Sequence, residues 1–254
     1  MAYKEKLPYT ILKIAYHYLW LRTEFRRVFP DNCISLTGFS FGKQGWHHLV
    51  ELLKQIENKV NLRFENSILY CYHKKYLPDG MYELVRNLDE DIRFRPRMGV
   101  FPWGAFQIGR GLNGKLEGVD WKRSRFCGPT DDELVRKEFD DFQRLYQRIK
   151  TQGYKPWKWG FIGGTLLKRS CGETRFIPLQ GNHRTAILAY LNQSGILVCS
   201  RKDSHSFIHE KDVLEWHYVK TGQCSKEDAL AYFNSFFELT GFEQARRFDL
   251  IQTQ

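Results

Sequence analysis

The hydrophobic residues between positions 130 and 153 recur every three or four positions along the chain. They are Val135, Phe139, Phe142, Tyr146 and Ile149. This spacing places them on one side of an amphipathic helix whose other side is charged. Thr130 and Glu133 fit a capping box at the start of this helix, and Gly153 is expected to end it.

Shorter apolar runs follow this helix. Residues 161–168 and 173–180 predict two strands, the first with an irregularity at Gly163-Gly164. A second helix is expected from Asn182, which is a favourable N-cap residue. The buried side of that helix would consist of Ala186, Ile187, Ala189, Tyr190 and Leu191. Residues 196–200 predict a further strand, so the order of elements indicates an α+β fold.

Helical patterns also flank this segment. Residues 46–56 predict one helix upstream of it. Two more are expected in the tail, at 211–220 and at 225–239, where Ser225 is the cap of the second. Residues 94–127 hold many glycines and aromatics, and we expect loops there.

Residues 8–29 are expected to form an N-terminal amphipathic helix that ends at Pro30. Two interpretations of it remain open. The helix packs on the body of the protein, or it rests on anionic lipid, because basic side chains follow its apolar stretch. The second interpretation predicts peripheral contact with the inner face of a membrane.

The whole chain of 254 residues is basic, with a formal net charge of +10 at pH 7, and 15% of its residues are aromatic. Its length and aromatic content predict a packed globular protein with a sizeable core. The positive charge favours phosphate-bearing small molecules, nucleic acid or an anionic membrane as partners. A nucleic-acid-binding tail is disfavoured, because the Lys and Arg residues are spread among acids.

The six cysteines lie far apart, without a Cys-x-x-Cys pair. We therefore expect reduced thiols in a cytoplasmic protein, not a disulfide framework or a zinc site. The first residues show no signal-peptide pattern, and no apolar run approaches the roughly 20 residues that a transmembrane helix needs.

The junction between the second strand and the second helix carries the clearest candidate chemistry. It reads Gly181-Asn182-His183-Arg184. Gly181 allows a sharp turn or a close approach to a ligand. The N–H groups and the dipole of a helix start favour an anion, and the guanidinium of Arg184 suits a phosphate. The same positive field favours a neutral imidazole at His183. The alternative is a capped helix in which His183 and Arg184 have only a structural role.

This motif and the order of elements around it resemble the ParB/sulfiredoxin superfamily over roughly residues 128–202. The match consists of a helix followed by Gly153 and Pro156, two strands, the Gly-Asn-His-Arg motif and a closing strand. The tail, with Val213-Leu214-Glu215-Trp216, is similar to that of bacterial proteins that carry this domain near their C-terminus.

From the resemblance together with the patterns above, we expect four segments. They are an N-terminal amphipathic helix at 1–30, an aromatic-rich and loop-rich region at 31–127, a ParB/sulfiredoxin-like domain at 128–204, and C-terminal helices at 205–254 that pack on the core.

Two activities of the superfamily are disfavoured by this sequence. In sulfiredoxins a catalytic cysteine stands where this chain has Asn182, so reduction of a sulfinic acid is not expected. Chromosome-partitioning ParB proteins bind CTP and then DNA through a helix-turn-helix. The predicted helix at 225–239 carries almost no basic side chain, which disfavours a DNA-binding CTPase and nucleic acid as a partner.

Small-molecule kinases of the superfamily keep a Gly-x-His-Arg motif, which this chain matches. The resemblance implies that ATP or CTP phosphates are bound by Gly181, Asn182, Arg184 and Thr185. It also implies that His183 assists at the transferring phosphoryl group and that Mg²⁺ neutralises charge.

Such a transfer needs a carboxylate that orients or deprotonates the acceptor hydroxyl. The nearest acids in the expected fold are Asp131, Asp132 and Glu133. Capping of the helix that follows explains the same three acids as an alternative.

Other patterns add little chemistry. Residues 35–45 are glycine-rich but lack the Lys-Ser/Thr ending of a P-loop, and no Gly-x-Ser-x-Gly elbow is present. Trp46-His47-His48 is interpreted as a loop-anchoring tryptophan followed by exposed histidines, with a pocket-lining role as the alternative.

We therefore expect a nucleotide- or phosphate-binding protein. Its leading activity would be phosphotransfer to a small hydroxyl-bearing metabolite, or nucleotide hydrolysis. A non-catalytic, nucleotide-gated binding or scaffold protein is the alternative.

Overall fold

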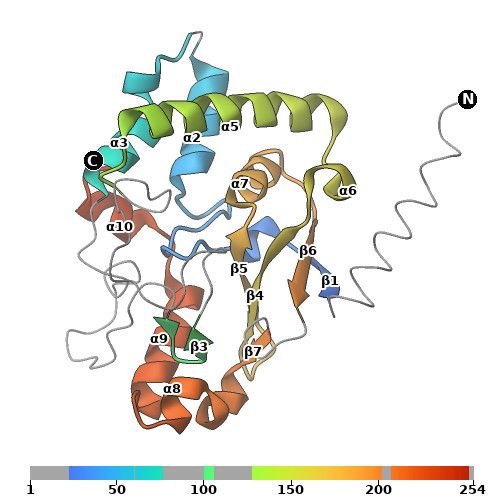
Figure 1. Cartoon of the computed structure of the whole chain (residues 1–254), viewed down its shortest axis with the longest axis vertical. Coiled ribbons are helices and arrows are strands. Elements are labelled where there is room, and N and C mark those ends of the chain that lie inside the picture. The colour runs from blue at the N-terminus through green and yellow to red at the C-terminus, as the bar shows by residue number, and fades with distance from the viewer. Residues whose placement is uncertain (1–22, 60, 77–99, 106–127, 202–206, 252–254) are drawn as a thin grey trace, which may run out of the picture.

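The computed structural model describes residues 23–59, 61–76, 100–105, 128–201 and 207–251. These residues form helices and a mixed sheet, so the fold is of the α+β class (Figure 1). The helices of this part are α2 (His48–Asn58), α3 (Ile68–Lys75), α5 (Asp132–Gln152), α6 (Pro156–Trp159), α7 (Asn182–Tyr190), α8 (His217–Lys220), α9 (Lys226–Glu238) and α10 (Phe242–Arg247). Short 3₁₀ helices are η1 (Pro30–Asn32), η2 (Phe64–Asn66) and η4 (Glu210–Glu215).

Five strands of the described residues make up the main sheet. They are β1 (Thr23–Val28), β4 (Ile162–Lys168), β5 (Thr174–Gln180), β6 (Ile196–Arg201) and β7 (Phe207–His209). β4 is central, with β5 antiparallel on one side. On its other side β6 pairs with the beginning of β4 and β7 with its end, both in parallel. β1 closes this edge antiparallel to β6. A separate hairpin joins β2 (Val100–Phe101) to β3 (Gly104–Ala105).

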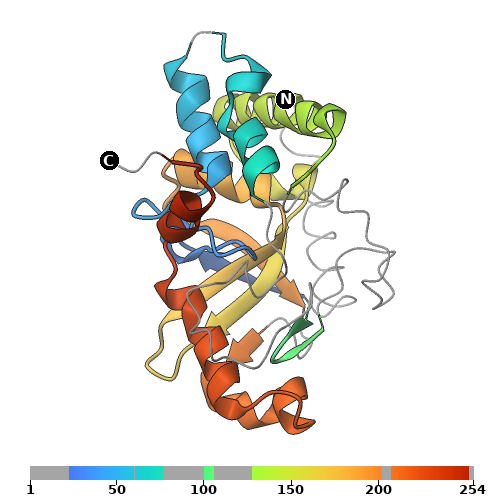
Figure 2. The same cartoon turned by 90° about the vertical axis from the view of Figure 1, so that its left-hand side faces the viewer.

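The sheet is buried on both faces. Neighbouring residues of a strand point to opposite faces, and here each set joins its own hydrophobic cluster. Leu166 and Phe176 join a cluster with residues of α2, α5 and α7. Leu167 and Ile177, one position further along, join a second cluster that contains the apolar side of α9. Figure 2 shows α9 running along the sheet, and the two clusters form the core of the molecule.

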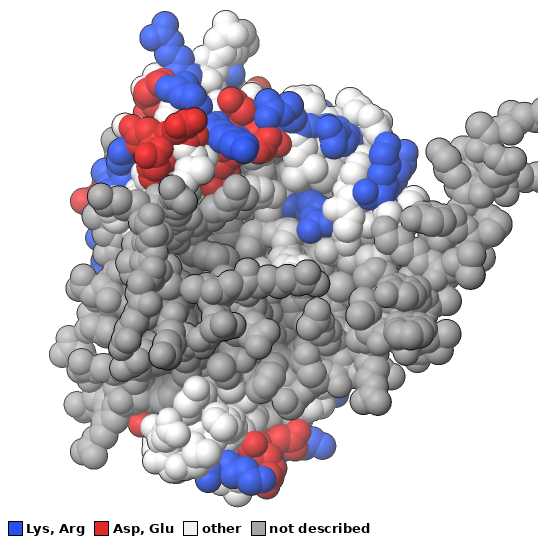
Figure 3. All heavy atoms as spheres, viewed as in Figure 1, with Lys and Arg blue, Asp and Glu red and all other residues white. Residues whose placement is uncertain are grey.

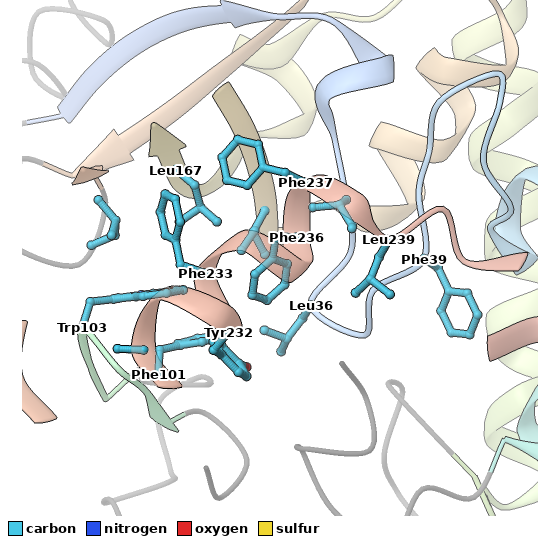
Figure 4. Packing of buried hydrophobic residues seen from close by; sticks show 14 of the residues in the cluster. Leu36, Phe39, Phe101, Trp103, Leu167, Tyr232, Phe233, Phe236, Phe237 and Leu239 are labelled. Atoms are coloured by element: carbon cyan, nitrogen blue, oxygen red, sulfur yellow. The ribbon is translucent and has the colours of Figure 1, made fainter. Parts of the chain in front are cut away.

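The cluster on the α9 face is built mainly from aromatic rings (Figure 4). Phe233 and Phe236 of α9 are fully buried, and they pack beside Trp103 from the β2–β3 hairpin. Phe101 and Trp103 stack with ring centroids 4.9 Å apart. Burial of each large apolar side chain stabilises the fold by roughly 1.5–3 kcal/mol. The C-terminal helices are therefore an integral part of the fold.

The helix predicted between residues 130 and 153 is confirmed as α5. Its five predicted apolar residues are buried, and it ends at Gly153, whose φ of 69° is easy only for glycine. The predicted cap is wrong by one residue. Asp131 is the N-cap and accepts a hydrogen bond from the Glu133 backbone N–H at 2.8 Å. Thr130 is buried instead, with its Oγ1 3.0 Å from His73 Nδ1.

The strands predicted at 161–168, 173–180 and 196–200 are confirmed as β4, β5 and β6. The irregularity at Gly163-Gly164 is a shift in the register between β4 and β5. A side chain at residue 164 would collide with the carbonyl oxygen of Ile177. Glycine is therefore required where the two strands approach each other.

The helix predicted for residues 8–29 is wrong at its C-terminal end, since residues 23–28 form strand β1. Residues 8–22 lie outside the described part, and so does most of the predicted loop region at 94–127. β1 and β7 also lie outside the range 128–204, yet they pair with strands inside it. One sheet therefore crosses the predicted boundaries at residues 30 and 204.

Other helices differ in smaller ways from expectation. The helix predicted at 225–239 is α9, and Ser225 caps it by accepting from the Asp228 backbone N–H at 3.0 Å. The segment 211–220 is divided between η4 and α8. α3 has no counterpart in the sequence prediction, and its cap is Ser67. Within the described residues, no helix combines the length and the apolar character that crossing a membrane requires.

Candidate functional site

The strand-to-helix junction that carries the predicted motif turns sharply at Gly181. Its φ of 90° and ψ of 28° lie in the left-handed region, which glycine adopts without strain. Asn182 is the first residue of α7 and not its cap, and no side chain caps this helix. The first helical bond runs from Thr185 N–H to Gly181 O, so the N–H groups of residues 182–184 have no partner within the helix.

A cavity of about 380 Å³ lies at this junction. Gly181, Asn182, His183 and Arg184 line one side of it. His47, His48 and Leu49, at the N-terminal end of α2, line another side. α2 packs against α7 (Figure 1). The N-terminal residues of both helices line the same cavity. Their dipoles make this cavity favourable for an anion.

His183 is paired with a buried carboxylate in this cavity. Its Nε2 lies 2.6 Å from Glu138 Oε1, on α5. The Glu138 side chain is 6% exposed and that of His183 is 27% exposed. Phe142, one turn further along α5, packs its ring at an angle to the imidazole, with centroids 5.2 Å apart. Because an ionised carboxylate only accepts, His183 donates through Nε2, and its Nδ1 is left as an acceptor.

The acids predicted for this role lie elsewhere. Asp131 caps α5, Asp132 forms an exposed ion pair with Lys74 at 2.6 Å, and Glu133 is exposed. None of the three lines the cavity. In Figure 3, acidic side chains gather over the α3 end of α5, where the N-terminal end of a helix dipole favours them. The structure therefore does not bring Asp131, Asp132 and Glu133 to the cavity, and Glu138, two turns further along α5, lines it instead.

Glu138 has a second histidine beside it. His73 of α3 is 1% exposed, and its Nε2 lies 3.7 Å from Glu138 Oε2. Its Nδ1 lies 3.0 Å from Thr130 Oγ1. Burial lowers the pKa of His73, which the nearby Glu138 opposes. One buried carboxylate is thus placed between two imidazoles.

His47 and His48 are not exposed as predicted, and the pocket-lining alternative is correct. They are 2% and 7% exposed and lie in a stack of rings. Phe41 and His47 are 4.0 Å apart between ring centroids, His47 and His48 4.6 Å, and His48 and Tyr72 3.6 Å. The stack forms the α2 side of the cavity.

Part of the Arg184 guanidinium already donates hydrogen bonds within the protein. Its Nη1 donates to the carbonyl oxygens of Trp159, at 2.6 Å, and Gly160 at the end of α6. The other edge of the guanidinium lies over Gly181, where an added Cβ would be 2.9 Å from Nη2 and 3.1 Å from Nε. Arg184 therefore connects the cavity to α6, and glycine at 181 leaves the room that it needs.

Thr185 does not line the cavity, in contrast to its predicted part in cofactor binding. It is 1% exposed, and its hydroxyl donates to the Gly181 carbonyl at 3.1 Å. Its role is to close the first turn of α7.

No family model, curated protein or solved structure matches this chain. The chemistry of the site is therefore inferred from the side chains around the cavity. The helix N-termini and histidines fit a phosphate group, as found in the predicted nucleotide cofactors. They do not fit Mg²⁺ as a resident ion, because Glu138 is the one acid among the described lining residues and is bonded to His183. The described residues contain no group of three or more His, Cys, Asp or Glu arranged to hold a metal.

Sequence reasoning missed Glu138, although a signal for it exists. Glu138 lies three residues after Val135 and four before Phe142, within the buried stripe of α5. Glutamate is rarely buried unless it has a partner, so an acid in an apolar stripe indicates a paired side chain. His73 had no such signal, because the aromatic and basic residues around it obscured the helical pattern of α3.

Proposed function

We propose that the cavity binds the phosphate of a nucleotide or of another small phosphorylated molecule, and that His183 with Glu138 serves transfer of that phosphate to a hydroxyl group. The observation that carries this proposal is the 2.6 Å contact between His183 Nε2 and the buried Glu138, at the N-terminal end of α7. The resemblance of Gly181-Asn182-His183-Arg184 to the motif of small-molecule kinases points in the same direction.

The support for phosphate comes from the backbone and from the charges around the cavity. The first N–H groups of α7 have no partner within their helix, and the N-termini of α2 and α7 add the positive ends of two dipoles at the cavity. Glu138, the acid of the described lining residues, is engaged by His183 and lies near His73. The guanidinium of Arg184, which also lines the cavity, offsets the negative charge of this carboxylate. The volume of about 380 Å³ lies within the range of small-molecule sites.

The support for proton transfer comes from the contact between Glu138 and His183, which leaves one ring nitrogen free to act. Glu138 accepts from Nε2 of His183, which fixes the ring and leaves Nδ1 as a base. In the proposed step, Nδ1 takes the proton of the acceptor hydroxyl as its oxygen bonds to phosphorus. The bond from phosphorus to the donor oxygen breaks, and the electron pair leaves with that oxygen. Glu138 stabilises the imidazolium, as a carboxylate does in other histidine-based sites.

One observation favours a second candidate, a binding protein without catalysis. Arg184 joins the cavity to the end of α6 through the carbonyls of Trp159 and Gly160. A phosphate that draws on the guanidinium would alter how α6 is held. Ligand binding would then change an exposed surface, since Trp157 of α6 is 44% exposed.

Substitution of Glu138→Gln tests the enzyme proposal, with Asp132→Asn as the matched control on the same helix. ATP, CTP and ADP are screened by thermal shift, and donor turnover is followed with pooled hydroxy metabolites. Glu138→Gln should keep nucleotide binding and lower turnover by about 10²–10⁴-fold, because His183, the general base, loses the carboxylate that orients its ring and stabilises its imidazolium. Asp132→Asn should keep both.

Three results separate the possibilities. Absence of binding to the wild-type protein overturns the phosphate site. Equal turnover in wild type and Glu138→Gln overturns the role of the dyad. Nucleotide binding without turnover in the wild type favours the non-catalytic candidate.

A further inference from the structure

His47 has a hydrogen-bond arrangement opposite to that of His183. It is the N-cap of α2, and its Nδ1 accepts from the Leu49 backbone N–H at 3.2 Å. A nitrogen that accepts carries no proton, so in the neutral ring the proton is on Nε2. His47 can therefore act toward the cavity only as a donor.

We propose that His47 is a second functional residue of the cavity, a neutral hydrogen-bond donor to a phosphoryl oxygen of the bound ligand. This role rests on the proposed function and adds a recognition element to it. His183 and His47 form a complementary pair: one accepts a proton from the hydroxyl, and the other donates a hydrogen bond to the oxygen on phosphorus.

The surroundings of His47 hold it in the neutral form. It is 2% exposed and stacks between Phe41 and His48. Burial, with a smaller contribution from His183, lowers its pKa from the usual 6.5 to about 3. The N-terminal end of α2 acts in the same direction, since a positive dipole end disfavours an added positive charge.

The titratable groups near His47, on the α2 side of the cavity, are mostly imidazoles. His48 lies on α2 itself, His73 on α3 and His183 on α7, and Glu138 of α5 is bonded to the last of these. Burial, with repulsion from neighbouring imidazoles, opposes the protonation of His47, His48 and His73. A neutral donor is useful here because it strengthens as negative charge develops on the oxygen, without changing its own protonation near pH 7.

A second observation points to a ligand on the α2 side of the cavity. His48 is 7% exposed and lines the cavity, and its Nδ1 has no hydrogen-bond partner among the described residues. Asn182 Oδ1, from the α7 side, is buried and likewise without a partner in that part of the chain. Buried polar atoms of folded proteins are normally bonded, and unbonded ones that border a cavity indicate where a ligand or its water binds.

Two variants of His47 separate the cap from the donor. Asn places an acceptor near the position of Nδ1, so His47→Asn keeps the cap but carries no donor to the position of Nε2. Gln reaches the position of Nε2, so His47→Gln keeps a donor but loses the cap. Inorganic phosphate and ATP are titrated into each full-length protein by calorimetry. We expect His47→Asn to weaken phosphate binding about tenfold or more, and His47→Gln to weaken it less than threefold while lowering the melting temperature more.

Long-range ¹H–¹⁵N spectra of the histidines give a readout that needs no ligand. His47 should show the Nε2–H tautomer from pH 5 to pH 8. A cationic ring or the Nδ1–H tautomer in that range would overturn the proposal. Equal phosphate affinity of wild type and His47→Asn would overturn the role of His47 alone. Absence of phosphate and ATP binding to the wild type would instead overturn the proposed function.

Discussion

The two faces of the sheet are covered by helices in different ways. On the α9 face, rings such as Phe233, Phe236 and Trp103 fill the space between the sheet and the C-terminal helices. On the α7 face, a similar apolar cluster is interrupted by histidines and Glu138 around the cavity. Polar groups in a core cost stability unless they are bonded, so their concentration on one face indicates function. The α9 face stabilises the molecule, and the α7 face holds the cavity for which we propose a chemical role.

The largest loss of stability without loss of ligand binding is expected on the α9 face, at Phe236. This ring is fully buried and packs beside Tyr232, with ring centroids 5.6 Å apart. Phe236→Ala should lower the free energy of unfolding by about 3–5 kcal/mol, because a cavity forms where the ring was. Urea denaturation measures the loss, and phosphate affinity of the folded fraction should stay unchanged. A change in affinity larger than threefold would show that the two faces are coupled.

A smaller loss of stability is expected when the pH is lowered, because of the buried histidines on the α7 face. The pKa of folded His47 is about 3, below the unfolded value of 6.5, so below pH 6.5 the unfolded chain binds a proton that the folded chain does not. Stability is therefore full above pH 6.5 and is lost as the pH falls toward 3. His47 alone removes roughly 2 kcal/mol between pH 6.5 and pH 5. Burial also lowers the pKa of His48 and of His73, which adds to the loss.

Urea denaturation at the two pH values measures this dependence. His47→Asn carries no titrating ring at this position, so it should lose less stability on acidification than the wild type. Equal losses in the two proteins would mean that His47 is not buried and neutral.

The smallest effect is expected at Asp131, which lies outside both faces. Asp131→Ala removes the cap of α5 and should lower the free energy of unfolding by about 1 kcal/mol. Nucleotide binding and turnover should not change, since the residue caps a helix and does not line the cavity. A large loss of turnover with little loss of stability would restore Asp131 as a catalytic acid.

Apart from the short helix α6, the elements from residue 130 to residue 201 could be predicted because their signals are local. The stripe from Val135 to Ile149 and the strand runs on either side of Glu173 specify their own structure. β1 could not be predicted in this way. Phe25 pairs with Cys199, and the strand exists through that distant partner. Residues 23–28 follow an apolar run with a helical pattern, so the predicted helix was extended through them.

The candidate site shows the same limit. His183 could be predicted, because the glycine and the helix start lie beside it in the chain. Glu138, His73 and His47 come from three other helices, and only packing brings them together. The carboxylate was sought at the start of α5, where caps concentrate acids, while the one beside His183 lies within the buried stripe of this helix.

Hydrogen exchange of the full chain, measured with and without ATP, CTP or inorganic phosphate, tests the central claim most directly. The account predicts ligand-dependent protection of backbone amides at the start of α2, near residues 47–50, and at the start of α7, near residues 181–185. It predicts no change along α9, residues 226–238. Protection that appears on the α9 face and spares the two helix starts, or no protection with any of the three ligands, would contradict it.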